Sequence, residues 1–164
     1  TAQGMAICFN ENDVRCMGRD AAGVRGISLN EGDYVVGAEK MEEGKTLLTV
    51  TENGYGKRTA LPEYLRTGPD GEKIPQSRGG KGLKNYNITP KTGNIAGCRV
   101  VGDNDDVMII ENGGVIIRVP AASINVYKRD VQGVIVMRVD DGNKVVSLER
   151  VEQDEEPEAQ ETQE

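Results

Sequence analysis

The sequence has 164 residues, with 20 Lys and Arg against 27 Asp and Glu, and a formal net charge of −7. It contains five Tyr, one Phe and no Trp, so Val, Ile, Leu and Met must supply its core. There is no His and no CxxC pair, which argues against a zinc site and against an imidazole base. There is also no signal peptide and no apolar run of membrane length, so we expect a cytoplasmic protein without a membrane partner.

Short β-branched runs separated by Gly, Asn and Asp predict strands along the whole chain. In chain order these runs are TLLTV from Thr46, DVMII from Asp106, GVIIRV from Gly114, GVIVMRV from Gly133 and KVVSLERV from Lys144. No helical period persists for three turns. The sequence therefore predicts an all-β fold.

Three ten-residue segments align without gaps, and we call them boxes 1, 2 and 3. They are MGRDAAGVRG (17–26), QSRGGKGLKN (76–85) and YKRDVQGVIV (127–136). Each box has an Arg four residues before a Gly: Arg19 and Gly23, Arg78 and Gly82, Arg129 and Gly133. Such internal similarity at a fixed period is typical of repeat architectures.

A second turn recurs before each box, and it ends in a glycine that leads into a strand. These hairpin glycines are Gly4, Gly54 and Gly114, and they precede the box glycines by 19, 28 and 19 residues. The excess in the middle copy falls in the Pro/Gly-rich loop RTGPDGEKI from Arg66. A unit of about 50 residues with four strands has the size of a propeller-type blade.

The phase of the repeat is unusual, because the first copy lacks the strand before Gly4. We expect that the sequence begins partway through one blade of a six-bladed disc, and that neighbouring blades exchange strands. Residues 1–151 are expected to form the blades, and residues 152–164 an acidic tail.

Box 2 is the most basic of the three turns, with Arg78, Lys81 and Lys84 and no acid nearby. Glycine lets the backbone approach a partner closely, and flanking cations can bind phosphates. One such turn is more often a solvated loop between blades, but three turns at blade spacing would place cations at intervals around a rim. That arrangement suits duplex DNA bound through its backbone.

The candidate DNA-binding residues are therefore the cations in and near the repeated turns. They are Arg19, Arg25, Lys57, Arg58, Arg78, Lys81, Lys84, Lys128 and Arg129, with Gly23, Gly79, Gly80, Gly82 and Gly133 as turn glycines. The absence of Trp argues against single-strand binding by base stacking.

The segment LLTVTENGYGKRTALPEY, together with boxes 1 to 3, resembles the C-terminal domain of the DNA gyrase A subunit. Gyrase is a type II topoisomerase. QSRGGKG is similar to the gyrase-A box of that family, Q-R-R-G-G-[KR]-G. The resemblance covers residues 1–151. It implies a β-pinwheel that wraps DNA and directs ATP-dependent negative supercoiling by the whole enzyme.

The resemblance implies a bacterial, nucleoid-associated protein whose partners are the gyrase A N-terminal domains and the gyrase B subunit. It places the cleaving Tyr and the sites for ATP and magnesium outside this domain, so the chain needs no cofactor and is not catalytic alone. Two features depart from the family pattern: Ser77 replaces the first Arg of the box, and the box lies in a late blade.

Three alternatives remain open. The related C-terminal domain of the topoisomerase IV A subunit lacks a strict box. A propeller scaffold that binds proteins would show no salt-dependent DNA affinity. An independent enzyme is disfavoured, because the chain has no His and no ligand cluster.

The tail, EQDEEPEAQETQE from Glu152, has seven acids and no base. This composition predicts a disordered segment. It is expected either to keep the protein soluble or to compete with DNA for the basic turns.

Overall fold

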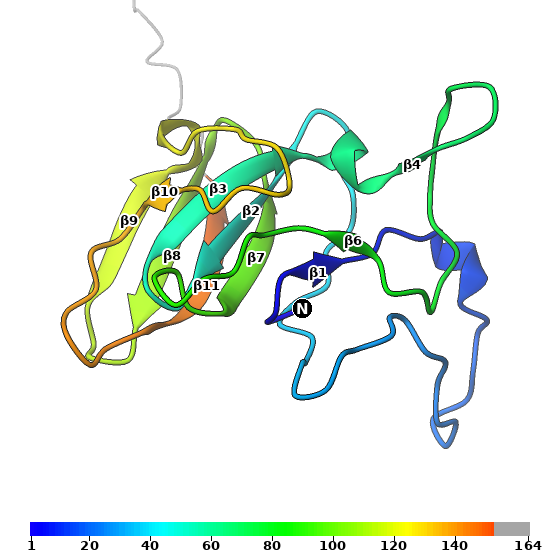
Figure 1. The fold of residues 1–164 in the computed structure, drawn as a ribbon, viewed down its shortest axis with the longest axis horizontal. Coiled ribbons are helices and arrows are strands. Elements are labelled where there is room, and N and C mark those ends of the chain that lie inside the picture. Colours follow the sequence, from blue (N-terminus) through cyan, green and yellow to red (C-terminus); the bar gives the residue numbers. More distant parts are fainter. Residues whose placement is uncertain (153–164) are drawn as a thin grey trace, which may run out of the picture.

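The computed structural model describes residues 1–152, in which antiparallel strands form two larger sheets and two small ladders (Figure 1). The strands are β1 (Met5–Ala6), β2 (Thr46–Thr51), β3 (Tyr55–Ala60), β4 (Arg66–Thr67), β5 (Lys73–Ile74), β6 (Leu83–Lys84), β7 (Ile95–Val101), β8 (Asp105–Glu111), β9 (Ile116–Pro120), β10 (Val134–Ile135) and β11 (Val145–Glu152). Three 3-10 helices join them: η1 (Glu11–Asp13), η2 (Leu61–Tyr64) and η3 (Ala121–Ser123). The predicted all-β fold is confirmed.

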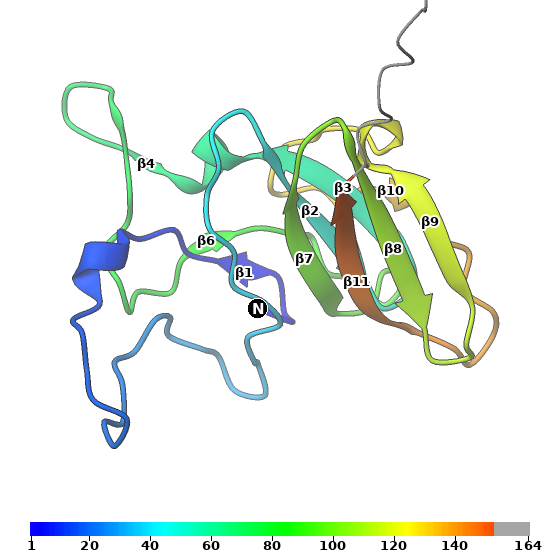
Figure 2. The ribbon, with the colours of Figure 1, turned by 180° about the vertical axis from the view of Figure 1, so that it is seen from behind.

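The first large sheet has four strands in the order β10-β3-β2-β7. β2 and β3 form a hairpin around the turn at Gly54, and β7 pairs with the other edge of β2. The second sheet has three strands in the order β11-β8-β9. In Figure 2, β7 of the first sheet lies beside β11 of the second.

The core lies between these two sheets and consists of aliphatic side chains, as the composition requires. Leu48 and Val50 from β2 meet Val107 and Ile109 from β8, and all four are fully buried. Leu148 from β11 packs into the same cluster. Burial of these side chains removes apolar surface from water, which is the main force that holds the sheets together.

Residues 1–45 contain little regular structure and lie beside the sheets rather than within them (Figure 1). Their one strand, β1, pairs with β6. The inserted segment from Arg66 to Ile74 is more ordered than the predicted loop, because β4 and β5 pair to form a small hairpin.

Strands are exchanged between consecutive repeats, as the phase of the sequence suggests. β10, from box 3, pairs with the hairpin strand of the second repeat, with Val134 opposite Gly56. β6, from box 2, pairs with the hairpin strand of the first repeat, with Leu83 opposite Ala6. In both pairings the residue five positions after the box arginine lies opposite the residue two positions after the hairpin glycine. The two pairings therefore have the same register.

Because of this exchange, no single copy holds a complete four-stranded blade within residues 1–152. A hairpin strand receives its outer partner from the box of the following copy, so the four-stranded sheet needs residues from two repeats. β9 is the hairpin strand of the third copy, and its outer edge has no strand partner among residues 1–152. The acidic tail, apart from Glu152 at the end of β11, lies outside the described residues.

Candidate nucleic-acid interface

Glycines create the repeated turns that place the boxes. The hairpin and box glycines all have positive φ: 91° at Gly4, 79° at Gly54, 92° at Gly114, 81° at Gly23, 75° at Gly82 and 70° at Gly133. At Gly82 and Gly133 a Cβ atom would lie 2.3 Å from the carbonyl oxygen of Ala6 and of Gly56, respectively. These two positions therefore require glycine both for backbone conformation and for close approach of the exchanged strand.

The three boxes lie next to one another, with box 2 in the middle. The Gly79 amide donates to the Gly26 carbonyl at 2.8 Å, and the Ser28 amide donates to the Gly80 carbonyl at 2.8 Å. On the other side of box 2, the Asn87 amide donates to the Val131 carbonyl at 3.4 Å. The fold thus joins turns that are more than 40 residues apart in the sequence.

Five of the predicted cations project from this row of turns into solvent. They are Arg19, Arg25, Lys81, Lys84 and Lys128. Box 2 carries three bases and no acid, whereas boxes 1 and 3 each carry two bases and one acid. The row is therefore a cationic strip, and its charge is greatest at the central turn. We call it the box strip.

The structure corrects the prediction for Lys57 and Arg58, which are buried rather than presented to a ligand. Lys57 is 0% exposed, and its ammonium group donates to the carbonyl oxygens of Lys128, at 2.7 Å, and of Arg129. The same group lies 5.1 Å from the centre of the Tyr86 ring. Burial lowers the pKa of Lys57 to about 8.

Arg58 is 6% exposed and also serves the fold. Its Nε donates to the Ile124 carbonyl at 2.7 Å, and its Nη1 lies 2.5 Å from Asp103 Oδ1. Both residues are on β3. This strand pairs with β2 along one edge and with β10, from box 3, along the other. The sequence pattern of β3, YGKRTA, does not reveal this burial, because the residues that cover Lys57 and Arg58 come from another repeat.

Arg78 and Arg129 are half-buried, and their guanidinium groups contact neighbouring backbone. Arg78 donates from Nε to the Asp13 carbonyl at 3.0 Å and from Nη1 to the Arg25 carbonyl at 2.5 Å. Arg129 donates from Nη1 to the Lys84 carbonyl at 2.8 Å. Direct phosphate contacts by these two arginines remain a prediction.

A buried polar network that sequence patterns did not reveal anchors box 2. The Tyr64 hydroxyl donates to Asn85 Oδ1 at 2.5 Å, and Asn85 Nδ2 donates to Thr49 Oγ1 at 3.2 Å. Gln76 donates to the Tyr64 carbonyl at 3.1 Å. Gln76 and Asn85 are the first and last residues of box 2, so the network fixes one end of the turn to η2 and the other to η2 and β2. Burial raises the pKa of Tyr64, which keeps the hydroxyl protonated as a donor.

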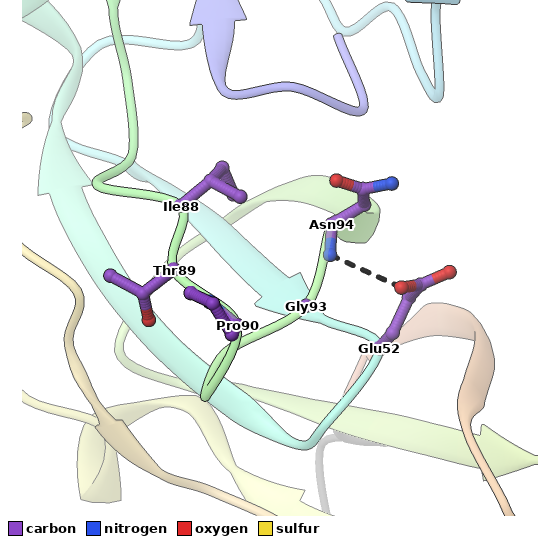
Figure 3. Close-up of a pocket in the computed structure, with 6 residues that line it drawn as sticks. All are labelled: Glu52, Ile88, Thr89, Pro90, Gly93 and Asn94. Atoms are coloured by element: carbon purple, nitrogen blue, oxygen red, sulfur yellow. Dashed lines mark hydrogen bonds between the residues drawn. The ribbon is translucent and has the colours of Figure 1, made fainter.

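An open hollow of about 340 Å³ lies away from the boxes, between the turn after β2 and the segment before β7 (Figure 3). The Glu52 carboxylate at its edge accepts from the Asn94 amide at 3.1 Å and pairs with Lys144 at 3.2 Å. Because that carboxylate already has two partners, the hollow offers little to a ligand.

Within residues 1–152, no group of three or more His, Cys, Asp or Glu side chains could hold a metal ion. No helix in that range is long and apolar enough to cross a membrane.

Comparison with known proteins gives the family of this fold. One family model, DNA gyrase C-terminal domain, beta-propeller, matches residues 1–40, 45–74, 72–102 and 105–152. The chain is 43% identical over 156 residues to the DNA gyrase A subunit of Staphylococcus epidermidis, a match that covers 94% of this chain and 16% of that protein.

Two solved structures are similar to the fold. A DNA gyrase A C-terminal domain matches with a TM-score of 0.80 and 29% identity, over 91% of this chain and 48% of that one. The C-terminal domain of a DNA topoisomerase IV matches with a TM-score of 0.80 and 26% identity, over 92% and 45%. These findings confirm the propeller-type fold. Since the family model covers almost all of the described residues, the chain belongs to the DNA gyrase C-terminal domain family.

Proposed function

We propose that the chain is a duplex DNA-binding module and that DNA lies along the box strip. The observation that carries this proposal is the alignment of three turns from different repeats, which gathers five exposed cations on one strip. Lysine and arginine side chains that neutralise phosphates give strong, sequence-independent binding. The central turn, box 2, makes the largest contribution because it carries Lys81 and Lys84 without a neighbouring acid.

The DNA follows a curved path over the strip and is wrapped rather than read base by base. This follows from the repeated geometry: boxes 2 and 3 are placed by the same exchanged-strand contact, and box 1 lies beside box 2, so successive cations meet successive parts of the DNA backbone. Contacts of this kind bind a bent duplex without base recognition.

In its parent protein this module directs the sign of DNA supercoiling by a type II topoisomerase. Its partners there are the gyrase A N-terminal domains and the gyrase B subunit, in the bacterial cytoplasm and at the nucleoid. ATP and magnesium act elsewhere in that enzyme, and this part holds neither cofactor nor catalytic residue. The support is the similarity to the DNA gyrase A subunit, of which the chain spans 16%.

A role in the A subunit of topoisomerase IV is the second candidate. One observation favours keeping it: the similarity to the topoisomerase IV domain has the same TM-score as the similarity to the gyrase domain. The two roles differ in the topology of the product. Nicked circles that are religated on a gyrase module should keep a wrap of one sign, whereas weak wrapping favours topoisomerase IV.

The binding proposal is tested with duplexes of different length. A duplex of about four helical turns spans several boxes, and its linked contacts should raise affinity well above that of a one-turn duplex. Equal affinity for the two lengths would confine DNA to one box and refute wrapping. Absence of measurable duplex binding at low salt would favour a protein-binding scaffold.

A further inference from the structure

The box arginine makes the same contact in two consecutive boxes. Arg78 Nη1 in box 2 donates to the carbonyl of Arg25 in box 1 at 2.5 Å. Arg129 Nη1 in box 3 donates to the carbonyl of Lys84 in box 2 at 2.8 Å. Arg25 and Lys84 occupy the same place, six residues after the arginine of their own box. Each Nη1 therefore reaches back to one defined position in the preceding box, and Arg78 Nε donates in addition to the Asp13 carbonyl before box 1.

The surrounding backbone repeats this contact. The amides of Ser28 and Asn87, nine residues after the arginines of boxes 1 and 2, donate to the carbonyls of Gly80 and Val131. These acceptors lie two residues after Arg78 and Arg129. The arginine and the amide therefore form a two-point junction between neighbouring boxes, and the junction has the same design at both places.

The positions that accept these bonds carry exposed cations. The side chains of Arg25 and Lys84 are exposed, while the half-buried guanidinium groups of Arg78 and Arg129 hold their carbonyls. Arg129 Nε is shielded from solvent and has no hydrogen-bond partner among the described residues. The inner part of this side chain is therefore buried. Fixing the backbone of a binding residue lowers the entropy lost when a ligand binds.

We propose that Arg78 and Arg129 are positioning residues that orient the exposed cation of the preceding box, Arg25 or Lys84, toward DNA phosphate. The role in DNA binding rests on the proposed function, whereas the junction itself does not. This assignment replaces direct phosphate contact by the two arginines. It also divides each junction into a half-buried arginine that sets geometry and an exposed cation that binds.

Amide hydrogen exchange without DNA tests the junction. Arg78→Gln should speed exchange of the Ser28 amide about tenfold, and Arg129→Gln should do the same for Asn87, because a charge-assisted bond beside each amide is lost. The Ile109 amide in β8 reports on the whole fold and should not change. Arg19→Gln is the matched control, since Arg19 is exposed, and it should leave both amides unchanged.

Unchanged exchange at Ser28 and Asn87 would overturn the junction. An equal acceleration at Ile109 would also overturn it, because the arginines would then stabilise the whole fold rather than the contact between boxes. Neither result depends on DNA, so failure of the junction can be told apart from failure of the proposed function.

A double-mutant cycle tests the coupling to DNA. Arg78→Gln should weaken duplex binding in the parent sequence but have little further effect after Arg25→Ala, because its action passes through Arg25. Arg129→Gln with Lys84→Ala should behave in the same way. The carbonyl acceptors of residues 25 and 84 belong to the backbone, so both alanine substitutions leave them in place. If the two effects multiply instead, each arginine binds phosphate independently and the proposed positioning role is wrong.

Discussion

Lys57 allows a quantitative test of the buried contacts that hold box 3. Its ordinary pKa of 10.5 falls to about 8 in the folded protein because the ammonium group is desolvated. Between these two pH values the unfolded chain binds the proton more strongly than the folded one. The free energy of unfolding should therefore rise with pH across this window. One pKa unit corresponds to about 1.4 kcal/mol, so the full rise is at most about 3 kcal/mol.

The comparison is with Lys57→Met, which has no titrating group at this position. Urea unfolding of both proteins at pH 7.5, 8.5 and 9.5 gives the difference in their free energies of unfolding. We expect that difference to shift by about 2 kcal/mol in favour of the parent protein as pH rises. Buried groups whose raised pKa acts in the opposite direction, such as Cys98, are common to both proteins and cancel.

A difference that stays constant from pH 7.5 to 9.5 would refute the reasoning. It would mean that Lys57 has an ordinary pKa in the folded protein, and that its bonds to the carbonyls of box 3 are open to water.

Three further predictions concern other parts of the fold. Gly133→Ala should lower the free energy of unfolding by more than the roughly 1–2 kcal/mol of left-handed backbone strain, since its Cβ would clash with Gly56 O. Gly114→Ala, with open space around its Cβ, should lose only the free energy of the backbone strain. Equal losses of unfolding free energy in the two variants, measured by urea unfolding, would contradict this. Tyr64→Phe should cost about 1 kcal/mol in the same assay by removing the bond to Asn85, and no loss would show that the network is not stabilising. Deleting residues 153–164, with six acids, should strengthen duplex binding most at low salt, whereas equal affinity at every salt concentration would leave the tail without a competing role.

Much of the fold could be predicted from the sequence, because its signals are local. Glycines at fixed offsets mark turns with positive φ, and the β-branched runs between them can pack only as strands. The gapless alignment of the boxes also anticipates the identical register of β6 and β10. Charge and glycine in box 2 likewise identify the exposed cations Lys81 and Lys84.

The remaining features depend on contacts between repeats, which a local pattern does not contain. Lys57 and Arg58 have the composition of a surface strand, but β10 and its box arrive from about 75 residues further along the chain and cover them. Arg78 has the sequence context of a phosphate ligand, yet its guanidinium donates to two carbonyls, 53 and 65 residues earlier in the chain. The exchange of strands therefore decides which cations are structural and which face solvent.

The salt dependence of duplex binding tests the central claim, that the box strip holds DNA phosphates. Lys81→Ala with Lys84→Ala should reduce the slope of log K against log salt by about 1.8, because each lost phosphate contact accounts for about 0.9. The matched control is Arg118→Ala with Lys144→Ala, which removes the same charge from exposed residues outside the boxes that pair with Asp106 and Glu52. We predict that the slope falls in the box variant and stays close to the parent value in the control. Equal slopes in the two variants would contradict binding at the box strip.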